Sequence, residues 1–393
     1  MLTKGPLAKI AVLVAALILF GSADAQIVRW EPEFRFSGTF FPAFAISAAG
    51  KDSQGTVDTA QAYGFLNSGS FGVKVIDAPA GALLKVQIEI PEIGVLGEIE
   101  APALTDGKPK VIVPRLSWSQ NKLATISQPI SSEVVFRIYV NGVPAGEERR
   151  PVRVRAINDA PLRSCGQPQQ CRDYSPYMAA FVNENHPVID GVLRAALDIP
   201  AMPVKNWTGA QGTEDEVLRQ VWAIWYLFQR NKMTYSSITT VSDVRQDIFS
   251  QTIRPLSQAL RTSQANCIDG TVLFASILRK IGIEPIIVLV PGHAFLGFYV
   301  DAQQTKPVFL ETTMLNDGNN PFNKHAPTKL GSAIAKFSGN DVHMQKSWQS
   351  FVDALNEGQR KYDVALPNFG KQAGFMIVPI MKARQSGILP LPL

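Results

Sequence analysis

Residues 266–313 of the chain read NCIDGTVLFASILRKIGIEPIIVLVPGHAFLGFYVDAQQTKPVFLETT, and they decide the fold of the region around them. After Cys267, apolar residues recur at steps of three and four until Gly282. This period predicts a buried helix that ends at the glycine. Asn266 suits the N-cap of the helix, and Asp269 suits its third position. Cys267 is therefore expected in the first turn of a buried helix.

Three strands are predicted beyond this helix, over residues 285–290, 292–299 and 308–313. A polar turn separates the last two strands, so we expect them to pair as a hairpin. His293 would then lie near the start of one strand. Glu311 would face it directly or diagonally on the other, with Cβ atoms within about 8 Å of each other.

Cys, His and Glu are the residue types that nucleophilic catalysis requires. Only a thiolate is a good nucleophile, and the unpaired N–H groups at a helix start stabilise it. The thiol also needs a base within hydrogen-bonding distance, and a third group must orient the base. Cys267, His293 and Glu311 are therefore the candidate catalytic residues of an acyl-transfer site. The charge of Asp269 would oppose a thiolate at Cys267, but we expect this carboxylate to cap backbone N–H groups instead.

Three short blocks resemble the transglutaminase-like superfamily of papain-type thiol enzymes: NCIDG at 266–270, PGHAF at 291–295 and LETT at 310–313. The resemblance implies an α+β domain with a catalytic triad. It makes the cysteine the nucleophile, the histidine the base and acid, and the glutamate the carboxylate that orients the histidine. A vaguer likeness extends upstream to Trp207.

The chain departs from the family pattern at the acid, where aspartate is commoner than glutamate. Asp301, at the end of the histidine strand, is therefore a weaker alternative to Glu311. The oxyanion of an acyl-transfer intermediate also needs hydrogen-bond donors. The backbone N–H of Cys267 is one expected donor, and Gln264 is a candidate for the other.

Residues 1–25 have the layout of a cleavable export signal. Lys4 and Lys9 precede an apolar run over residues 10–20, and small residues close it at 23–25. The run is shorter than the roughly 20 residues that a bilayer span requires, so a membrane anchor is the weaker alternative. We therefore expect a secreted or periplasmic protein with no integral membrane span after the signal is cleaved.

Export also changes the interpretation of the cysteines. An oxidising compartment favours a disulfide between Cys165 and Cys171, which flank a short polar loop. Such a bond closes a small ring, so it would pin a loop more than stabilise the whole fold. Cys267 is then the unpaired cysteine, either as a buried apolar filler or as a reactive thiol.

Residues 26–157 contain short β-branched runs that are separated by turn signals and show almost no helical period. This pattern predicts an antiparallel, immunoglobulin-like β-sandwich made of strands and turns. The run over 134–140, the Asn141-Gly142 dipeptide and the run over 150–155 predict a hairpin with a longer loop. The segment contains no His and no Cys, and its expected role is packing or partner binding.

Prolines recur through residues 158–212, which we interpret as a connecting region. The transglutaminase-like domain is expected over residues 213–320. It opens with an amphipathic helix, for which Thr213 and Glu216 would form a capping box. Residues 321–393 are expected to pack on this domain as a C-terminal extension.

The composition bounds the remaining possibilities. The chain has 393 residues, of which 46% are hydrophobic and 18% charged, and this indicates a globular protein with more than one domain. A net charge of +5 is too mild for a nucleic-acid-binding protein. The histidines have no Cys or His neighbours at metal-ligand spacing, and no phosphate-binding glycine loop occurs. We therefore expect neither a metal nor a cofactor.

These observations favour a cysteine hydrolase of the peptidase or amidase kind, which would act on protein or peptide substrates through a thioester. Hydrolysis is favoured over protein cross-linking because water is available at an exported site by default. A binding module that keeps the fold without turnover is the alternative outside the enzymes. The sequence does not indicate an oligomeric state.

Overall fold

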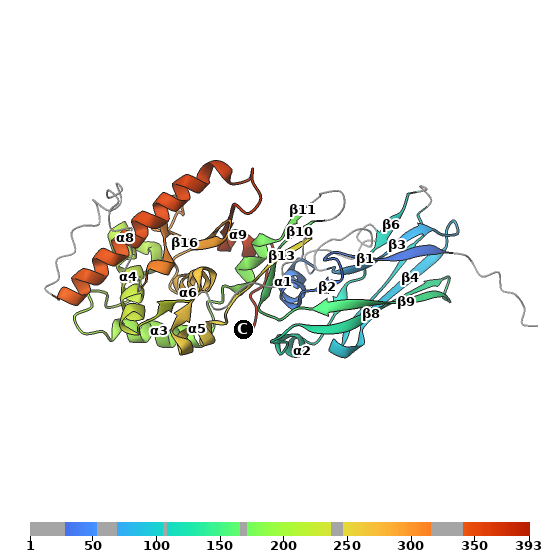
Figure 1. Cartoon of the computed structure of the whole chain (residues 1–393), viewed down its shortest axis with the longest axis horizontal. Coiled ribbons are helices and arrows are strands. Elements are labelled where there is room, and N and C mark those ends of the chain that lie inside the picture. Colours follow the sequence, from blue (N-terminus) through green and yellow to red (C-terminus); the bar gives the residue numbers. More distant parts are fainter. Residues whose placement is uncertain (1–27, 53–68, 105–107, 166–170, 237–246, 316–340) are drawn as a thin grey trace, which may run out of the picture.

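The computed structural model describes residues 28–52, 69–104, 108–165, 171–236, 247–315 and 341–393. The predicted export signal lies outside the described residues. Within these ranges the chain is a mixed α+β protein with several sheets, arranged in a strand-rich part and a helix-rich part (Figure 1). None of the described helices combines the length and the hydropathy that a membrane span requires.

The strand-rich part contains two sheets. Its elements are β1 (Arg29–Phe34), β2 (Thr39–Phe40), α1 (Pro42–Asp52), β3 (Phe71–Asp77), β4 (Leu83–Ile90), β5 (Val95–Pro102), β6 (Lys110–Ile112), β7 (Leu116–Ser117), α2 (Gln120–Ala124), β8 (Ile130–Val140) and β9 (Val143–Val154). Strands β2-β9-β8-β4-β5-β7 form a curled, six-stranded half-barrel, and β1-β3-β6 form a second sheet. Phe34 of β1 and Phe71 of β3 pack on Phe136 of β8, with ring centroids 5.5 and 6.4 Å apart, so an aromatic cluster joins the two sheets.

The expectation of strands and turns alone is wrong for this part, because it also contains the helices α1 and α2. Residues 42–48 of α1 are all buried. A helix that is buried on all sides does not show the apolar and polar faces that reveal a helix in a sequence. Pro42 at its first position is compatible with a helix start, since a proline there loses no intrahelical hydrogen bond.

The hairpin of β8 and β9 is present, but its loop is shorter than predicted. Val140 pairs with Val143, so the loop consists of Asn141 and Gly142, both with positive φ (52° and 81°). Two such residues match the twist of the flanking strands. Beyond the loop, Gly146 lies within β9, although glycine is unfavourable inside a strand. A Cβ atom at this position would lie 2.9 Å from the Trp30 indole nitrogen. Close packing on Trp30 therefore explains why a glycine occurs in this strand.

The rest of the chain forms the helix-rich part. Its elements are β10 (Asp159–Cys165), β11 (Cys171–Asp173), α3 (Val188–Leu197), α4 (Glu214–Arg230), β12 (Thr234–Tyr235), β13 (Ile248–Thr252), α5 (Leu256–Thr262), β14 (Gln264–Ala265), α6 (Cys267–Lys280), β15 (Pro285–Val290), β16 (His293–Tyr299), β17 (Pro307–Leu310), α8 (Val342–Ala365), β18 (Met376–Pro379) and α9 (Ile380–Gln385). The main sheet has the order β17-β16-β15-β18 and is antiparallel. Two smaller sheets, β11-β10-β13 and β12-β14, are formed by strands that precede β15 in the chain.

Several expectations for this part agree with the structure. The capping box of Thr213 and Glu216 is present at the start of α4, and the predicted disulfide joins Cys165 to Cys171. Residues 158–212, interpreted as a connecting region, also contribute β10, which pairs with β13. The C-terminal residues likewise contribute β18, which pairs with β15 of the main sheet.

Helices α6 and α8 hold the main sheet in place. Helix α6 packs against β15 and β16, and α8 packs against α4 and β17. Between α4 and α8 the Trp222 and Trp348 rings lie 5.2 Å apart in an edge-to-face arrangement. Tyr362 of α8 stacks on Phe309 of β17 at 3.8 Å. The long C-terminal helix is therefore fixed on both of its neighbours by aromatic contacts.

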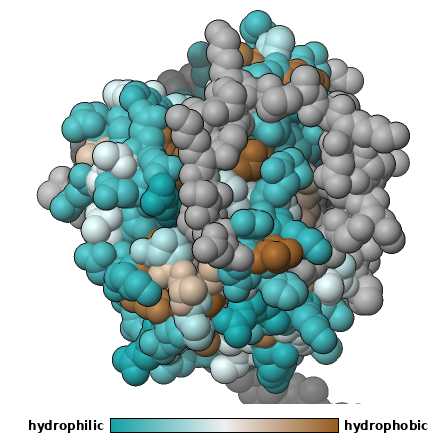
Figure 2. Space-filling model, turned by 90° about the vertical axis from the view of Figure 1, so that its left-hand side faces the viewer, coloured by the Kyte–Doolittle hydropathy of each residue, from teal (hydrophilic) through white to brown (hydrophobic). Residues whose placement is uncertain are grey.

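The last residues of the chain run between the two parts (Figure 1). The Leu389 N–H donates to the carbonyl of Ser47 in α1 at 2.9 Å, and the Leu391 N–H donates to the carbonyl of Ala180 at 2.8 Å. The outer end of the helix-rich part, where α8 begins, is mainly hydrophilic with separate apolar residues (Figure 2). Scattered apolar residues of this kind are normal on a folded surface.

Candidate active site

Cys267 is the first residue of α6, and the cap of this helix fixes its position. The Asn266 side chain accepts the Asp269 N–H at 2.8 Å, while the Asp269 carboxylate accepts the Asn266 N–H at 3.2 Å. The Asp269 carboxylate also accepts the Arg254 N–H at 2.7 Å. Asp269 is buried, and its expected role as a cap is confirmed. Its charge is therefore matched by backbone donors and by the nearby Arg254 guanidinium.

The thiol itself is free and half-buried. Beside it runs β12, which pairs with β14 so that Tyr235 lies opposite Ala265, two residues before Cys267. Tyr235 is 52% exposed. Partial burial, followed by the negative charges of Cys267 and Glu311, raises the pKa of Tyr235. The Tyr235 phenol therefore stays protonated near the site.

His293 begins β16, and Glu311 directly follows β17. The pairing of these strands aligns Leu296 with Leu310, so continuing the register by one residue would bring Glu311 opposite Phe295. Glu311 is thus diagonal to His293, two positions along the strand, and its length spans the offset. One oxygen of Glu311, Oε2, lies 2.7 Å from Nε2 of the His293 ring.

The Glu311 carboxylate is buried but fully hydrogen-bonded. Its side chain is 1% exposed. One oxygen accepts the backbone N–H of Thr313 at 3.0 Å and the Thr313 hydroxyl at 2.6 Å. The other oxygen faces His293 and also accepts a hydrogen bond from the Lys361 ammonium at 2.6 Å. A buried charge with this set of partners is stable as a carboxylate.

The charges of these groups shift their pKa values in opposite directions. Burial alone would raise the pKa of Glu311. The hydrogen bond and charge of His293, followed by the interaction with Lys361, outweigh burial and hold this pKa at about 2. Burial also disfavours a charged His293 ring, but hydrogen bonds with Cys267 and Glu311 and the Glu311 charge raise its pKa to about 9. At neutral pH the site therefore contains a carboxylate beside an imidazolium.

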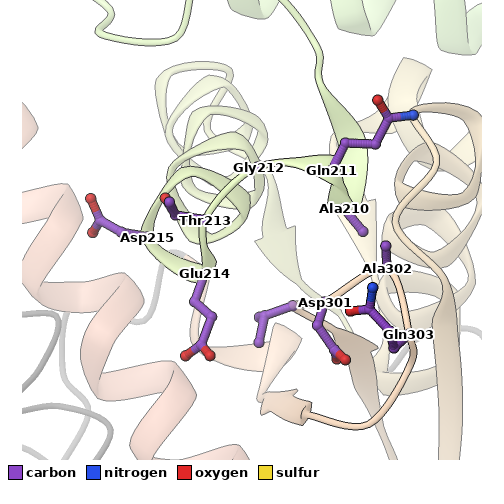
Figure 3. A pocket seen from close by; sticks show the side chains of 10 residues that line it. Ala210, Gln211, Gly212, Thr213, Glu214, Asp215, Asp301, Ala302 and Gln303 are labelled. Carbon is purple, nitrogen blue, oxygen red and sulfur yellow. The ribbon is translucent and has the colours of Figure 1, made fainter.

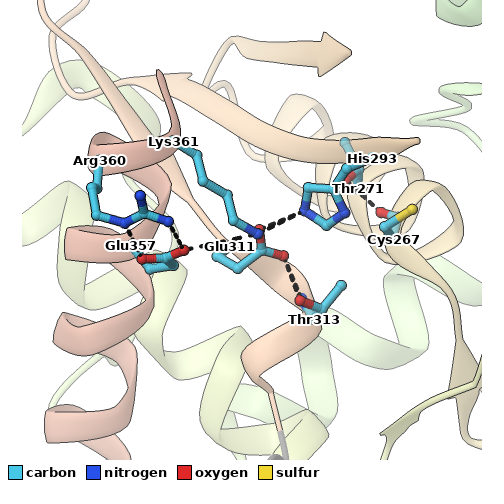
Figure 4. Close-up of polar contacts among 8 residues, drawn as sticks. All are labelled: Cys267, Thr271, His293, Glu311, Thr313, Glu357, Arg360 and Lys361. Atoms are coloured by element: carbon cyan, nitrogen blue, oxygen red, sulfur yellow. Dashed lines mark hydrogen bonds and ion pairs between the residues drawn. The ribbon is translucent and has the colours of Figure 1, made fainter. Parts of the chain in front are cut away.

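The imidazole ring lies between the carboxylate and the thiol (Figure 4). Its Nε2 atom faces Glu311, which leaves the other ring nitrogen for the thiol side. An imidazolium held by a carboxylate can stabilise a neighbouring thiolate and can later donate its proton. The structure thus brings together the three side chains that the sequence singled out, in an arrangement suited to acyl transfer.

The alternative acid, Asp301, has other partners. It lies in the turn after β16, where its carboxylate accepts the backbone N–H groups of Thr305 at 3.0 Å and Lys306 at 2.8 Å. Asp301 lines a hollow of about 570 Å³ at the start of α4. Figure 3 shows Glu214 across from it. Asp301 therefore stabilises a turn, and Glu311 is the carboxylate that binds His293.

A cluster of metal ligands is not apparent in the part of the chain that the structure describes. Across these residues, no group of three or more His, Cys, Asp or Glu side chains gathers as a metal would require. Gln264, the candidate oxyanion donor, lies half-buried in β14, three residues before Cys267. Its role as a donor remains a prediction.

Two residues of the site escaped the sequence interpretation. Lys361 lies in α8, 68 residues after His293 in the chain. A charged residue at such a position is typical of a solvated helix face. Tyr235 had a weak signal, since it belongs to the vaguer upstream likeness. No spacing rule connects either residue to Cys267, and only the folded chain brings them near it.

Comparisons with known proteins do not identify a family. No protein-family model matches the chain, and no curated protein is similar to it. The functional interpretation therefore depends on the geometry of the site.

Proposed function

We propose that this protein is an exported, cysteine-dependent acyl-transfer enzyme that hydrolyses amide bonds in peptides or proteins. The observation that carries the proposal is the His293 ring, which is held by Glu311 at 2.7 Å on one nitrogen and interacts with Cys267. A histidine that serves only as packing has no need of a fully buried carboxylate on one side and a free thiol on the other.

In the first step, the Cys267 thiolate attacks the amide carbonyl carbon, and negative charge develops on the carbonyl oxygen. The backbone N–H of Cys267 belongs to the first turn of α6, where N–H groups lack partners within the helix, so it can donate to this oxygen. Gln264 and Tyr235 are the candidates for a second donor. When the C–N bond breaks, the His293 imidazolium donates its proton to the leaving amine, and a thioester remains on Cys267.

In the second step, the neutral His293 ring removes a proton from a water molecule, whose oxygen attacks the thioester. The C–S bond breaks and the carboxylic acid product leaves. The Cys267 thiolate then forms again beside the imidazolium. Glu311 stays ionised throughout and keeps the ring in the same orientation, as its buried hydrogen bonds require.

We also propose that the helix-rich part has a transglutaminase-like, papain-like fold and that the strand-rich part is an immunoglobulin-like sandwich. The first proposal is supported by a cysteine at a helix start, a histidine on the next strand but one and an acid after the following strand. The second is supported by two sheets joined by an aromatic cluster. Export is supported by the signal-like residues 1–25 and is compatible with the disulfide.

The first test is the reactivity of the thiol. We expect iodoacetamide to alkylate Cys267 at pH 6 at least about tenfold faster in the folded protein than in the urea-unfolded chain, because an imidazolium beside the sulfur would favour its reactive form. His293→Gln should abolish the enhancement. His343→Gln, which alters an exposed ring at the start of α8, is the matched control and should react like the wild type. Equal rates for folded and unfolded chains would remove the chemical basis of the proposal.

The second test is turnover. The folded protein is incubated with a casein peptide mixture in ¹⁸O-labelled water, with and without a fluorescent primary amine. Incorporation of ¹⁸O at new carboxyl ends supports hydrolysis, whereas incorporation of the amine supports cross-linking. Cys267→Ser should show neither. A reactive thiol without either product would favour a binding module that keeps the fold.

A further inference from the structure

Lys361 of α8 contacts both the acid and the ring of the candidate triad. Its ammonium nitrogen lies 2.6 Å from Oε2 of Glu311 and 3.0 Å from Nε2 of His293 (Figure 4). The Lys361 side chain is 27% exposed, whereas the carboxylate that it contacts is 1% exposed. One carboxylate oxygen therefore interacts with two cationic groups at once.

The packing of α8 places the ammonium at this position. The Glu311 N–H donates to the carbonyl of Ala354 in α8 at 3.0 Å. One turn later, Gly358 allows close approach, because a Cβ atom there would lie 2.6 Å from the Phe309 backbone. Lys361 follows after three more residues and so projects from the same face of the helix onto Glu311. The contact is therefore built into the helix–strand packing.

The groups that face His293 come from four elements. Cys267 approaches from α6, and Glu311 from the end of β17. Lys361 approaches from α8, where it also lies 4.0 Å from the buried Glu357. Tyr235 of β12 is near enough for the charges of Cys267 and Glu311 to raise its pKa. The thiolate and the carboxylates favour a protonated ring, and among these groups Lys361 is the cation that opposes them.

We infer that Lys361 is a positioning residue that balances the charge of Glu311, so that the His293 ring is neutral and can accept a proton from water when the thioester is hydrolysed. This inference rests on the proposed function. The second step needs a neutral ring to accept a proton from water, and a ring locked as imidazolium cannot do so. The pKa of His293 is already raised to about 9, and the charge of Lys361 lowers it.

The test is a pH titration of the His293 ring in the full chain. The ring is monitored by NMR on protein with ¹³C-labelled histidine rings. The His293 resonance is assigned by its loss in His293→Gln. We expect Lys361→Met to raise the titration midpoint by about one pH unit or more, which is the usual effect of a charge at this range. Lys361→Arg keeps the charge and should stay close to the wild type. Lys346→Met removes an exposed lysine earlier on α8 and should leave the midpoint unchanged.

A kinetic readout separates positioning from mere structural support. p-Nitrophenyl acetate acetylates Cys267 in a burst, and the slower phase reports hydrolysis of the acetyl thioester. Lys361→Met should keep the burst amplitude and lower the slow phase at pH 8 by up to about tenfold, because less of the ring is neutral. Lys361→Gln repeats the measurement if the methionine variant proves unfolded by circular dichroism.

The outcomes are distinguishable. An unchanged midpoint in folded Lys361→Met or Lys361→Gln overturns the inference, as does an equal rise in Lys346→Met. Equal alkylation rates for the folded and unfolded wild type would instead overturn the proposed function. The titration would still report the effect of Lys361 on the ring in that case.

Discussion

The two sides of the His293 ring are built in different ways. On the thiol side, the N-cap, the thiol and the capping carboxylate lie within four consecutive residues, 266–269, and a local capping box fixes them. On the acid side, Glu311 depends on a strand end, a turn and a helix that begins 31 residues later. The comparison shows that the candidate nucleophile is positioned by local sequence, whereas the carboxylate that binds the histidine is positioned by tertiary packing.

The strongest way to separate the two sides is to remove the charge of Glu311. Glu311→Gln keeps the size of the side chain but removes the negative charge beside the ring and leaves the ammonium of Lys361 there, so the pKa of His293 should fall. We expect alkylation of Cys267 at pH 6 to slow by at least about tenfold, since each pKa unit is a factor of ten. Amide turnover should fall by roughly 10²- to 10⁴-fold.

The matched control for this variant is Glu284→Gln. Glu284 is a half-buried carboxylate paired with Arg279 at 2.6 Å. Its backbone carbonyl accepts the N–H of Tyr299, which is the last residue of β16, whereas His293 is the first. Its replacement should leave the alkylation rate of Cys267 unchanged. Wild-type alkylation in Glu311→Gln would mean that the acid side has no influence on the thiol.

The packing of α8 on β17 can be tested by adding a single methyl group. Gly358→Ala should lower the free energy of unfolding by about 1–3 kcal/mol, because the new Cβ atom would overlap the Phe309 backbone. Urea denaturation measures the effect. At the exposed Gly191 of α3, a Cβ atom meets nothing within 4 Å, so Gly191→Ala should stabilise the protein by about 0.5–1 kcal/mol. A stabilised Gly358→Ala variant would contradict the close approach of α8.

The smallest effect is expected from the cap on the thiol side. Asn266→Ala removes the acceptor for the Asp269 N–H and should lower the free energy of unfolding by about 1 kcal/mol. It should also slow the alkylation of Cys267, because the helix start is less well fixed. Ser119→Ala removes the N-cap of α2 in the strand-rich part and should leave the alkylation rate unchanged. Equal alkylation rates in both variants would show that the cap of α6 does not influence the reactivity of the thiol.

The same contrast explains what could be predicted from the sequence. The bounds of β15 and the start of α6 follow from period, cap and glycine signals that lie within the elements themselves. Hairpin pairing predicted Glu311 directly opposite or diagonal to His293, and the strand register has the diagonal arrangement. Helix α1 was missed because its buried residues show no period. Lys361 was missed because a charged residue on a helix looks the same whether it faces water or a carboxylate.

The hydrogen bond from the Glu311 amide to Ala354 has a practical consequence for anyone who expresses this region alone. A fragment cut after residue 320 would retain all three residues of the candidate triad, yet it would lack the helix against which the acid is anchored and the outer strand β18. We expect such a fragment to be poorly folded, because the Glu311 carboxylate would lose the partners that α8 provides. The minimal piece for crystallisation or inhibitor screening therefore extends through the last helix of the chain.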